Sequence, residues 1–258
     1  MATILFPSPI FGPVKSRRLG VSLGLNLLPS DGKICNFDCV YCECGLNAEH
    51  RPKQDMPTRR QVALALEAKL KAMLEAGDTI DAITFAGNGE PTSHPDFKEI
   101  VDDVMAIRDR YFPNATVCLL TNATNILKPS VRRAVESIDR ACLKLDSVDI
   151  DYVRFVNRPT CVYRLDELLE AMRSIGKKCV IQTMFLKGTW EGQCVDNTGE
   201  VAVQAWLEAI RTINPNGVDL YTISRDTPAK TLQKAGAEEL DRIADRVRAL
   251  GISAHAYY

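Results

Sequence analysis

The sequence lacks any apolar run that approaches the roughly 20 residues needed to span a bilayer, so it predicts no membrane-spanning helix. Its first 15 residues are interrupted by Pro7, Pro9 and Pro13 and contain no continuous apolar core like that of a secretory signal peptide. Internal repeats and low-complexity linkers are also missing. These absences favour one globular domain over residues 1–258, a length that buries a substantial core.

An excess of charge of either sign is missing too. The 258 residues include 32 Lys and Arg and 33 Asp and Glu, for a net charge of -1, so the chain as a whole is not a generic polyanion binder. A local basic stretch does occur at residues 50–60. Cysteine, in contrast, is plentiful: nine cysteines without a paired framework indicate a reducing compartment and predict a cytoplasmic protein.

Three of the cysteines, Cys35, Cys39 and Cys42, form one short loop with the spacing C-x-x-x-C-x-x-C. Thiolates at this spacing can all reach one small inorganic centre. Zinc sites usually take two separated pairs of ligands, and ferredoxins take four cysteines at other spacings. Three ligands therefore indicate a four-iron cluster with one iron open to a non-protein ligand. A structural zinc knuckle, or Cys44 as a fourth ligand, is the alternative.

A second motif, Gly87-Asn88-Gly89-Glu90-Pro91, ends a later predicted strand. The cysteine spacing, with Tyr41 before the last cysteine, resembles the radical S-adenosylmethionine (SAM) superfamily. The second motif is similar to the glycine-glycine-glutamate motif of that family, in the variant form Gly-Asn-Gly-Glu. Both motifs occur in the family's order, and together they count strongly against the zinc interpretation.

The resemblance implies that Cys35, Cys39 and Cys42 hold a [4Fe-4S] cluster whose open iron is chelated by SAM. It implies that residues 87–90 hold the SAM amino group and that the backbone near Tyr41 meets the adenine. A reduced flavodoxin or ferredoxin is the expected electron donor. One electron then cleaves SAM to methionine and a 5′-deoxyadenosyl radical, which removes a hydrogen atom from the substrate. The protein orients the cofactor and excludes water.

Apolar periodicity predicts six alternating strand–helix units, and such alternation specifies a parallel sheet covered by helices. A closed eight-stranded barrel needs two more units, so we expect an open six-stranded (β/α) barrel, a partial TIM barrel. The family resemblance implies the same α/β fold. The predicted strands are 21–28, 81–87, 116–122, 140–146, 179–186 and 217–224, with 252–258 as a candidate for a last short strand.

Two helices carry specific predictions. The first begins near Thr58 and has Gly77 at its C-terminal cap. The second begins within residues 92–95, with Pro95 in its first turn. The expected buried stripe of the first helix is Val62, Leu66, Leu70, Met73 and Leu74.

Polar residues gather at the carboxyl ends of the predicted strands, where barrel enzymes have their active sites. In the strand 140–146, Lys144 and Asp146 face one way, while Leu143 and Leu145 face the other. In related enzymes a comparable position contacts the SAM ribose or carboxylate, and a mutual salt bridge is the alternative. Tyr221 and Gln182 are candidates for contacts to adenine. The residues at strand ends are Glu90, Asn122, Asp146, Gln182 and Ser224.

Two further segments are candidates for substrate contacts. The segment 187–198 is predicted to be a long loop in which Trp190 stacks on a ring and Cys194 is a reactive catalytic thiol, with plain packing as the alternative. Arg17 and Arg18 precede the first strand. They either meet phosphate or a substrate carboxylate, or pair with acidic residues on the barrel rim.

Within the superfamily, the segments 16–20, 87–92 and 157–159 (Ser-Arg-Arg-Leu-Gly, Gly-Asn-Gly-Glu-Pro-Thr and Asn-Arg-Pro) are similar to proteins related to the wyosine tRNA-base synthases. This resemblance implies modification of an RNA base, which the basic stretch favours and the near-neutral charge disfavours. The other hypotheses are activation of a glycyl-radical enzyme, radical chemistry on a small molecule or peptide, and a non-catalytic zinc or iron module.

Overall fold

The computed structural model describes residues 4–258. Residues 1–3, which belong to the predicted domain 1–258, lie outside the described residues. Its main sheet has eight strands. The first is antiparallel to its neighbour, and the other seven run parallel. In spatial order they are β1 (Ile10–Ser16), β2 (Gly20–Leu25), β3 (Ala82–Phe85), β4 (Thr116–Thr121), β5 (Arg140–Lys144), β6 (Cys179–Met184), β9 (Gly217–Tyr221) and β11 (Ser253–Tyr257).

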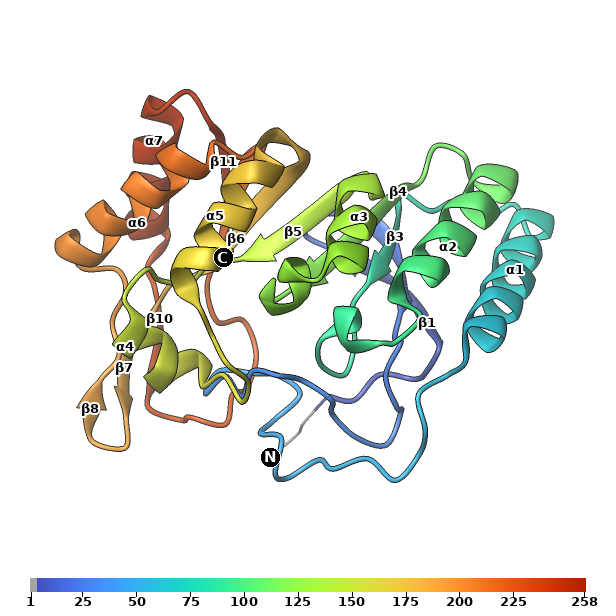
Figure 1. Ribbon diagram of the computed structural model, residues 1–258, viewed down its shortest axis with the longest axis horizontal. Coiled ribbons are helices and arrows are strands. Elements are labelled where there is room, and N and C mark those ends of the chain that lie inside the picture. Colours follow the sequence, from blue (N-terminus) through green and yellow to red (C-terminus); the bar gives the residue numbers. More distant parts are fainter. Residues whose placement is uncertain (1–3) are drawn as a thin grey trace.

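Helices follow the strands in chain order. All of them except the short α4 (Ile150–Tyr152) line the outer side of the sheet, from α1 (Arg59–Glu75) at one end to α7 (Ala237–Ala249) at the other (Figure 1). None of the helices within residues 4–258 is both long enough and apolar enough to cross a membrane. The α-helices are α1 (Arg59–Glu75), α2 (Phe97–Tyr111), α3 (Pro129–Ser137), α4 (Ile150–Tyr152), α5 (Leu165–Ile175), α6 (Glu200–Ile213) and α7 (Ala237–Ala249). The short 3-10 turns are η1 (Pro91–Ser93), η2 (Thr124–Leu127) and η4 (Gly176–Lys178), and η3 (Val153–Asn157) is a π-turn.

The sheet confirms the predicted open barrel class, with two more strands than the six expected. The candidate strand at 252–258 is present as β11. The unpredicted strand is β1, which contains Gly12 and Pro13, two residues that normally argue against a strand. They are tolerated because β1 lies at the edge of the sheet and its register shifts between Phe11 and Val14.

The two faces of each strand meet different surroundings, as the period-two pattern predicts. Leu143 of β5 and Leu145, which directly follows the strand, belong to the large apolar core beneath the helices. Cys142 faces the barrel interior, where it packs with Cys118 and Val180. Leu19 and Leu120 pack against the same interior cluster. Nearer the carboxyl ends of the strands, the interior holds the polar side chains of Lys144 and Gln182.

Helix α1 begins as predicted, with a capping box between Thr58 and Gln61 and with Gly77 just past its end at φ +74°. The prediction that Leu74 is buried was wrong, since that residue is 52% exposed. Met73 lies on the buried face of the helix, and the next residue, Leu74, is rotated about 100° away from it. Helix α2 begins only at Phe97, later than expected. The segment before it forms η1 because the Glu90 side chain accepts a bond from Thr92 N.

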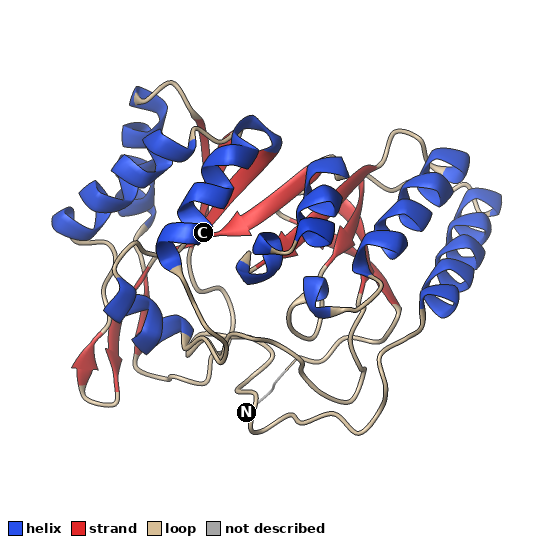
Figure 2. Ribbon diagram, viewed as in Figure 1, coloured by secondary structure: helices blue, strands red, loops and turns tan. Residues whose placement is uncertain are grey.

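The predicted loop 187–198 is instead a β-hairpin. Strands β7 (Leu186–Trp190) and β8 (Gln193–Cys194) pair with each other, and β10 (Leu232–Lys234) adds to β7. This three-stranded sheet projects from the main body beside α4 (Figure 2).

Candidate active site

The cysteine loop is joined to the Gly-Asn-Gly-Glu turn by backbone hydrogen bonds. Ile34 N donates to Asn88 O at 3.0 Å, and Glu90 N donates to Ile34 O at 2.9 Å. Between these bonds lies Gly89, whose φ is +131° and whose Cβ, if present, would stand 1.9 Å from Ile34 O. The contact between the two motifs therefore requires glycine at this position, because any Cβ would collide with the Ile34 carbonyl oxygen.

The thiols of Cys35, Cys39 and Cys42 are half-buried or buried in this loop. Burial raises the pKa of Cys35 well above its usual range and that of Cys39 to about 11. Nitrogen donors face two of the sulfurs. Asn157 Nδ2 lies 3.5 Å from Cys39 Sγ, and Asn122 Nδ2 lies 3.7 Å from Cys35 Sγ. Such donors stabilise sulfur that carries negative charge.

Lys33 is a buried cation beside the same loop, and the sequence analysis did not identify it. Its Nζ donates to Gly45 O at 2.7 Å and lies 3.7 Å from Asp38 Oδ1. Burial opposes its charge, yet attraction to the thiolates of Cys42, Cys35 and Cys39 raises the pKa of Lys33 above 10.5. A lysine two residues before the first cysteine was the available signal, and its charge compensates that of the thiolates.

Cys44, the alternative fourth ligand, lies against Cys42 and the second motif. Its Sγ is 3.6 Å from Gly87 O. A hydrogen bond from the Cys44 thiol, with a smaller contribution from Lys33, lowers the pKa of Cys42 and favours a thiolate there. The Cys44 thiol is thus a donor to its neighbour in this arrangement.

Glu90 is buried beneath the loop, and its carboxylate accepts four hydrogen bonds. Thr92 donates from N at 3.0 Å and from Oγ1 at 2.5 Å, Thr121 Oγ1 donates at 2.6 Å and Asn122 N at 2.7 Å. Burial raises the pKa of Glu90. The neighbouring Asn88 is fully buried, and its side chain is bonded to the backbone of Phe6 and Pro29.

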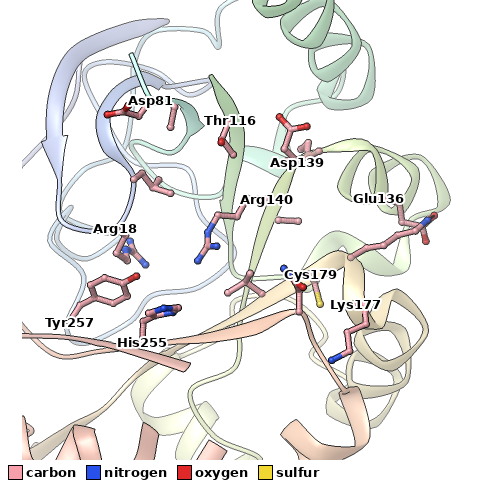
Figure 3. A pocket seen from close by; sticks show the side chains of 17 residues that line it. Arg18, Asp81, Thr116, Glu136, Asp139, Arg140, Lys177, Cys179, His255 and Tyr257 are labelled. Carbon is pink, nitrogen blue, oxygen red and sulfur yellow. Dashed lines mark ion pairs between the residues drawn. The ribbon is translucent and has the colours of Figure 1, made fainter. Parts of the chain in front are cut away.

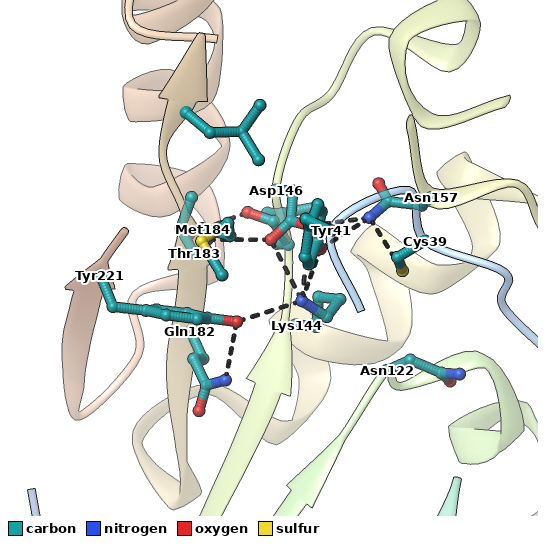
Figure 4. A network of polar contacts seen from close by, with 12 residues as sticks. Cys39, Tyr41, Asn122, Lys144, Asp146, Asn157, Gln182, Thr183, Met184 and Tyr221 are labelled. Carbon is teal, nitrogen blue, oxygen red and sulfur yellow. Dashed lines mark hydrogen bonds and ion pairs between the residues drawn. The ribbon is translucent and has the colours of Figure 1, made fainter. Parts of the chain in front are cut away.

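A polar network connects the cysteine loop to the barrel interior (Figure 4). Tyr41 OH donates to Asp146 Oδ2, and Asn157 Nδ2 donates to the same carboxylate at 2.8 Å. Lys144 Nζ lies 2.9 Å from Tyr41 OH and 3.2 Å from Tyr221 OH. Burial opposes the Lys144 charge, but Asp146 raises its pKa. The salt bridge expected between Lys144 and Asp146 is present at 3.4 Å.

Gln182 extends the network inward, since its Nε2 donates to Tyr221 OH at 3.0 Å. The structure thus brings together the predicted residues Tyr41, Lys144, Asp146, Gln182 and Tyr221. Ser224, in contrast, is exposed on the loop after β9.

Asn157 is the main residue that the sequence analysis passed over. It ends the π-turn Val153–Asn157, and its amide lies within 3.5 Å of Cys39 Sγ, Tyr41 OH and Asp146 Oδ2. The Asn-Arg-Pro segment was noted as a resemblance, but no position was assigned to its side chains. A π-turn is frequently found at functional sites and has no clear sequence signature.

The predicted residues of the hairpin lie apart from this network. Cys194 is exposed on β8 and pairs with Thr189 across the hairpin. Trp190 is half-buried and packs against the apolar cluster that includes Phe37 and Val40 of the cysteine loop. The packing alternative thus describes Trp190, and Cys194 as a catalytic thiol stays a prediction.

The donor set fits an iron–sulfur cluster. Three thiols from one loop are soft ligands, and amide donors face their sulfurs, as is usual around such clusters. Across residues 4–258, no group of three or more His, Cys, Asp and Glu side chains is arranged to hold a single metal ion.

Comparison with known proteins identifies the family. The family model described as "Radical SAM superfamily" matches residues 30–196, which is more than half of the chain. A UPF0026 protein of Synechocystis is 30% identical over 234 residues, covering 89% of this chain and 79% of that protein. The GTPase Obg of Brachyspira hyodysenteriae is 28% identical over 237 residues, covering 90% of this chain but only 32% of that protein.

Solved structures share the fold at low sequence identity. A radical SAM methyltransferase from Sphaerobacter thermophilus superposes with a TM-score of 0.67 and 18% identity, covering 92% of this chain and 66% of that one. TYW1 with a lysine-pyruvate adduct superposes with a TM-score of 0.57 and 14% identity, covering 88% of this chain and 73% of that one. The matched family consists of enzymes that use a [4Fe-4S] cluster and SAM. The chain belongs to the radical SAM superfamily.

Proposed function

We propose that this enzyme cleaves SAM reductively and abstracts a hydrogen atom from a small substrate bound inside the barrel. Cys35, Cys39 and Cys42 hold the cluster in this proposal. The observation that carries it is the backbone pairing of Ile34 with Gly89. This pairing fixes the cysteine loop beside Glu90, so that ligands of the cluster and of the cofactor share one rigid unit.

The cofactor site would use residues from both sides of this unit. Glu90 and the backbone of 87–89 face the SAM amino group, as the family motif implies. Asn122 Nδ2 donates to Asn36 Oδ1 at 2.6 Å, which fixes the part of the cysteine loop next to Cys35. Lys144 and Asp146 supply opposite charges for the polar groups of the cofactor, and Tyr41 and Asn157 hold that pair in place.

When bound, the cluster and SAM supply the one-electron cleavage and the hydrogen-atom abstraction. The protein's own contribution is orientation and exclusion of water. Val40 and Tyr41 of the cysteine loop are buried, and Val195, which follows β8, packs into the same apolar cluster. This cluster closes the side of the site nearest the hairpin, and reduced flavodoxin or ferredoxin would deliver the electron from outside.

The proposed substrates differ in size and therefore in how they would reach the cofactor. A tRNA base or a glycyl-radical enzyme must reach the cofactor from outside the protein. A small molecule can occupy the barrel interior, where Arg18, Gln182 and Tyr221 form a polar wall below Lys144. We favour the small molecule because this wall continues into a cavity, and the RNA base remains the alternative that the wyosine-related resemblance supports.

The test is reconstitution under anaerobic conditions. Wild type is expected to bind four iron atoms per chain, as a [4Fe-4S] cluster requires, and to release 5′-deoxyadenosine from SAM after reduction with dithionite. Cys39→Ala should lose both properties. Cys161→Ala is the matched control, since Cys161 is an exposed cysteine outside the loop. Full 5′-deoxyadenosine formation by Cys39→Ala would disprove the proposal.

A further inference from the structure

A cavity of about 710 Å³ opens at the amino-terminal end of the barrel, opposite the cysteine loop (Figure 3). It lies where several parallel strands begin, and Ala82, Thr116 and Arg140 of β3, β4 and β5 line it. The volume lies within the range of small-molecule sites, which is about 300–1,000 Å³. None of the residues that line it is among those predicted to hold the cluster or SAM.

Arg18 points into the cavity with most of its donors unused. Its Nη1 donates to Gln182 Oε1 at 2.6 Å, and its guanidinium lies 5.3 Å from the centre of the Tyr221 ring. Among residues 4–258, no carboxylate forms an ion pair with Arg18. A half-buried guanidinium that spends one donor of five on a neutral amide retains the capacity to bind an oxyanion in a paired fashion.

Arg140 is the second guanidinium that lines the cavity (Figure 3). Its Nη2 donates to both oxygens of Asp219, at 2.9 Å and 2.8 Å. Its Nε is buried, and within the described part of the chain it has no hydrogen-bond partner. Buried donors are nearly always bonded, so this nitrogen marks a place where a further acceptor is expected.

The acidic residues of the lining do not neutralise Arg18, because their carboxylates are engaged elsewhere. Asp139 binds Arg108 at 2.7 Å, Glu136 lies 3.9 Å from Lys178, and Asp81 accepts from the backbone of Val21 at 2.7 Å. Lys177, also in the lining, donates to the backbone of Pro215 at 3.2 Å and forms no ion pair within the described residues. The cavity therefore has unpaired positive charge at Arg18 and Lys177.

We propose that this cavity binds the carboxylate or phosphate group of a small anionic molecule, with Arg18 as its principal contact and Arg140 as the second. The proposal rests on the function proposed above and names its substrate class. Arg18 is joined through Gln182 and Tyr221 to Lys144, so a chain of hydrogen bonds connects the anion site to the predicted cofactor residues. Of the two sequence-based alternatives for Arg18, anion binding is the one that its contacts support.

The test measures oxyanion binding to the full chain by isothermal titration calorimetry in buffer free of phosphate and carboxylates. Inorganic phosphate and succinate are the two probes, and the stronger one identifies the anionic group. Arg18→Gln should weaken binding of that probe by about tenfold or more, because a charge-assisted bond is lost. Arg18→Lys keeps the charge without the planar fork and should fall between wild type and Arg18→Gln.

Arg17→Gln is the matched control. Arg17 is the adjacent, exposed arginine, and its Nη1 is bonded to the backbone oxygen of Tyr258 outside the cavity lining. It makes the same change in charge and should leave binding unchanged. The pair Arg140→Gln with Asp219→Asn removes the second guanidinium without leaving a buried charge, and it should also weaken binding. Equal binding by wild type and Arg18→Gln, or an equal loss in Arg17→Gln, would overturn the proposal.

These outcomes are separate from the proposed function, because the titration needs neither SAM nor reduction. Arg18-dependent binding in a protein that does not cleave SAM would support the cavity and refute the radical chemistry. SAM cleavage without any binding of either probe would do the reverse. Retention of an RNA oligonucleotide at equal strength by wild type and Arg18→Gln, with no binding of either probe, would also overturn the cavity proposal in favour of RNA.

Discussion

The carbonyl oxygen of Ile34 lies directly against Gly89, and a Cβ atom on that glycine would stand 1.9 Å away from it. This contact joins two sequence motifs that are distant in the chain into one structural unit. Ile34 is hydrogen-bonded to the residues on either side of Gly89, since Ile34 N donates to Asn88 O and Glu90 N donates to Ile34 O in a parallel bridge. The cysteine loop therefore depends on the turn for its position, and a change at the turn should be felt at the cluster.

Gly89→Ala is expected to destabilise the fold and to reduce iron binding. The added methyl group meets a backbone oxygen that cannot move without breaking the Ile34 pairing, and φ of +131° is a strained region for alanine. We expect a loss of about 3 kcal/mol or more in the free energy of unfolding, measured with urea. Iron per chain after anaerobic reconstitution should fall with it.

Gly77→Ala provides the comparison for this prediction. Gly77 also has a positive φ, +74°, but a Cβ there meets nothing within 4 Å. Its cost should therefore be only that of a left-handed alanine, about 1 kcal/mol, with iron binding unchanged. Equal costs at the two glycines would show that the contact with Ile34 does not hold the loop.

This contact also shows what the sequence could and could not predict. The Gly-Asn-Gly-Glu pattern was sufficient to predict a turn after β3 beside the cofactor site. The structure adds a reason that the sequence did not reveal, since Gly89 leaves room for the carbonyl oxygen of Ile34. Spacing reveals which residues form a motif, but it carries no information about which backbone from elsewhere in the chain packs against it.

Lys144→Met is expected to cost about 3–5 kcal/mol in the free energy of unfolding, because it leaves the buried carboxylate of Asp146 without its cation. Lys144 and Asp146 are both largely buried, and their ion pair is 3.4 Å long. Adding Asp146→Asn should recover part of the loss, since an amide oxygen still accepts from Met184 N. Additive losses in a double-mutant cycle would mean that the two charges do not interact.

The exposed cysteines give a prediction that depends on pH. In the cluster-loaded protein, the exposed Cys161 and Cys194 should react with a thiol reagent such as DTNB without unfolding, Cys194 quickly and Cys161 more slowly, whereas the buried Cys118 and Cys142 should react only after unfolding. Partial burial raises the pKa of Cys161 above 9.0, so less thiolate is present at pH 8 than for an ordinary thiol. Its rate should therefore be low at pH 8 and rise steeply up to pH 10. Cys194→Ser should remove one rapidly reacting thiol, and failure to do so would contradict its exposed position.

The hairpin and the π-turn explain why the remaining part of the site was hard to predict. Residues 187–198 contain Gly188 and Gly192 and were interpreted as a loop, yet β10 from a distant segment pairs with the first of them. Helix and strand periods are local properties, and both features depend on partners far away in the chain. The parallel sheet was predictable from the alternation of strands and helices. The polar face of β5 was predictable because a period of two in a strand fixes which side chains share the interior.

Asn157→Leu is expected to make the cluster harder to reduce. The Asn157 amide lies 3.5 Å from Cys39 Sγ, and hydrogen bonds to cluster sulfurs favour the reduced, more negative state. A tenfold change in the equilibrium constant for one-electron reduction corresponds to a shift of about 59 mV. We expect a negative shift of about this size in the reduction potential, measured by potentiometric titration followed by electron paramagnetic resonance.

Asn125→Leu is the control, because the Asn125 amide is also buried but is bonded to Thr92 and not to a thiol. If either substitution acted only by disturbing the structure, it would lower the amount of iron retained but leave the reduction potential of the remaining clusters unchanged. An unchanged reduction potential in Asn157→Leu would therefore show that the Asn157 amide does not act on Cys39.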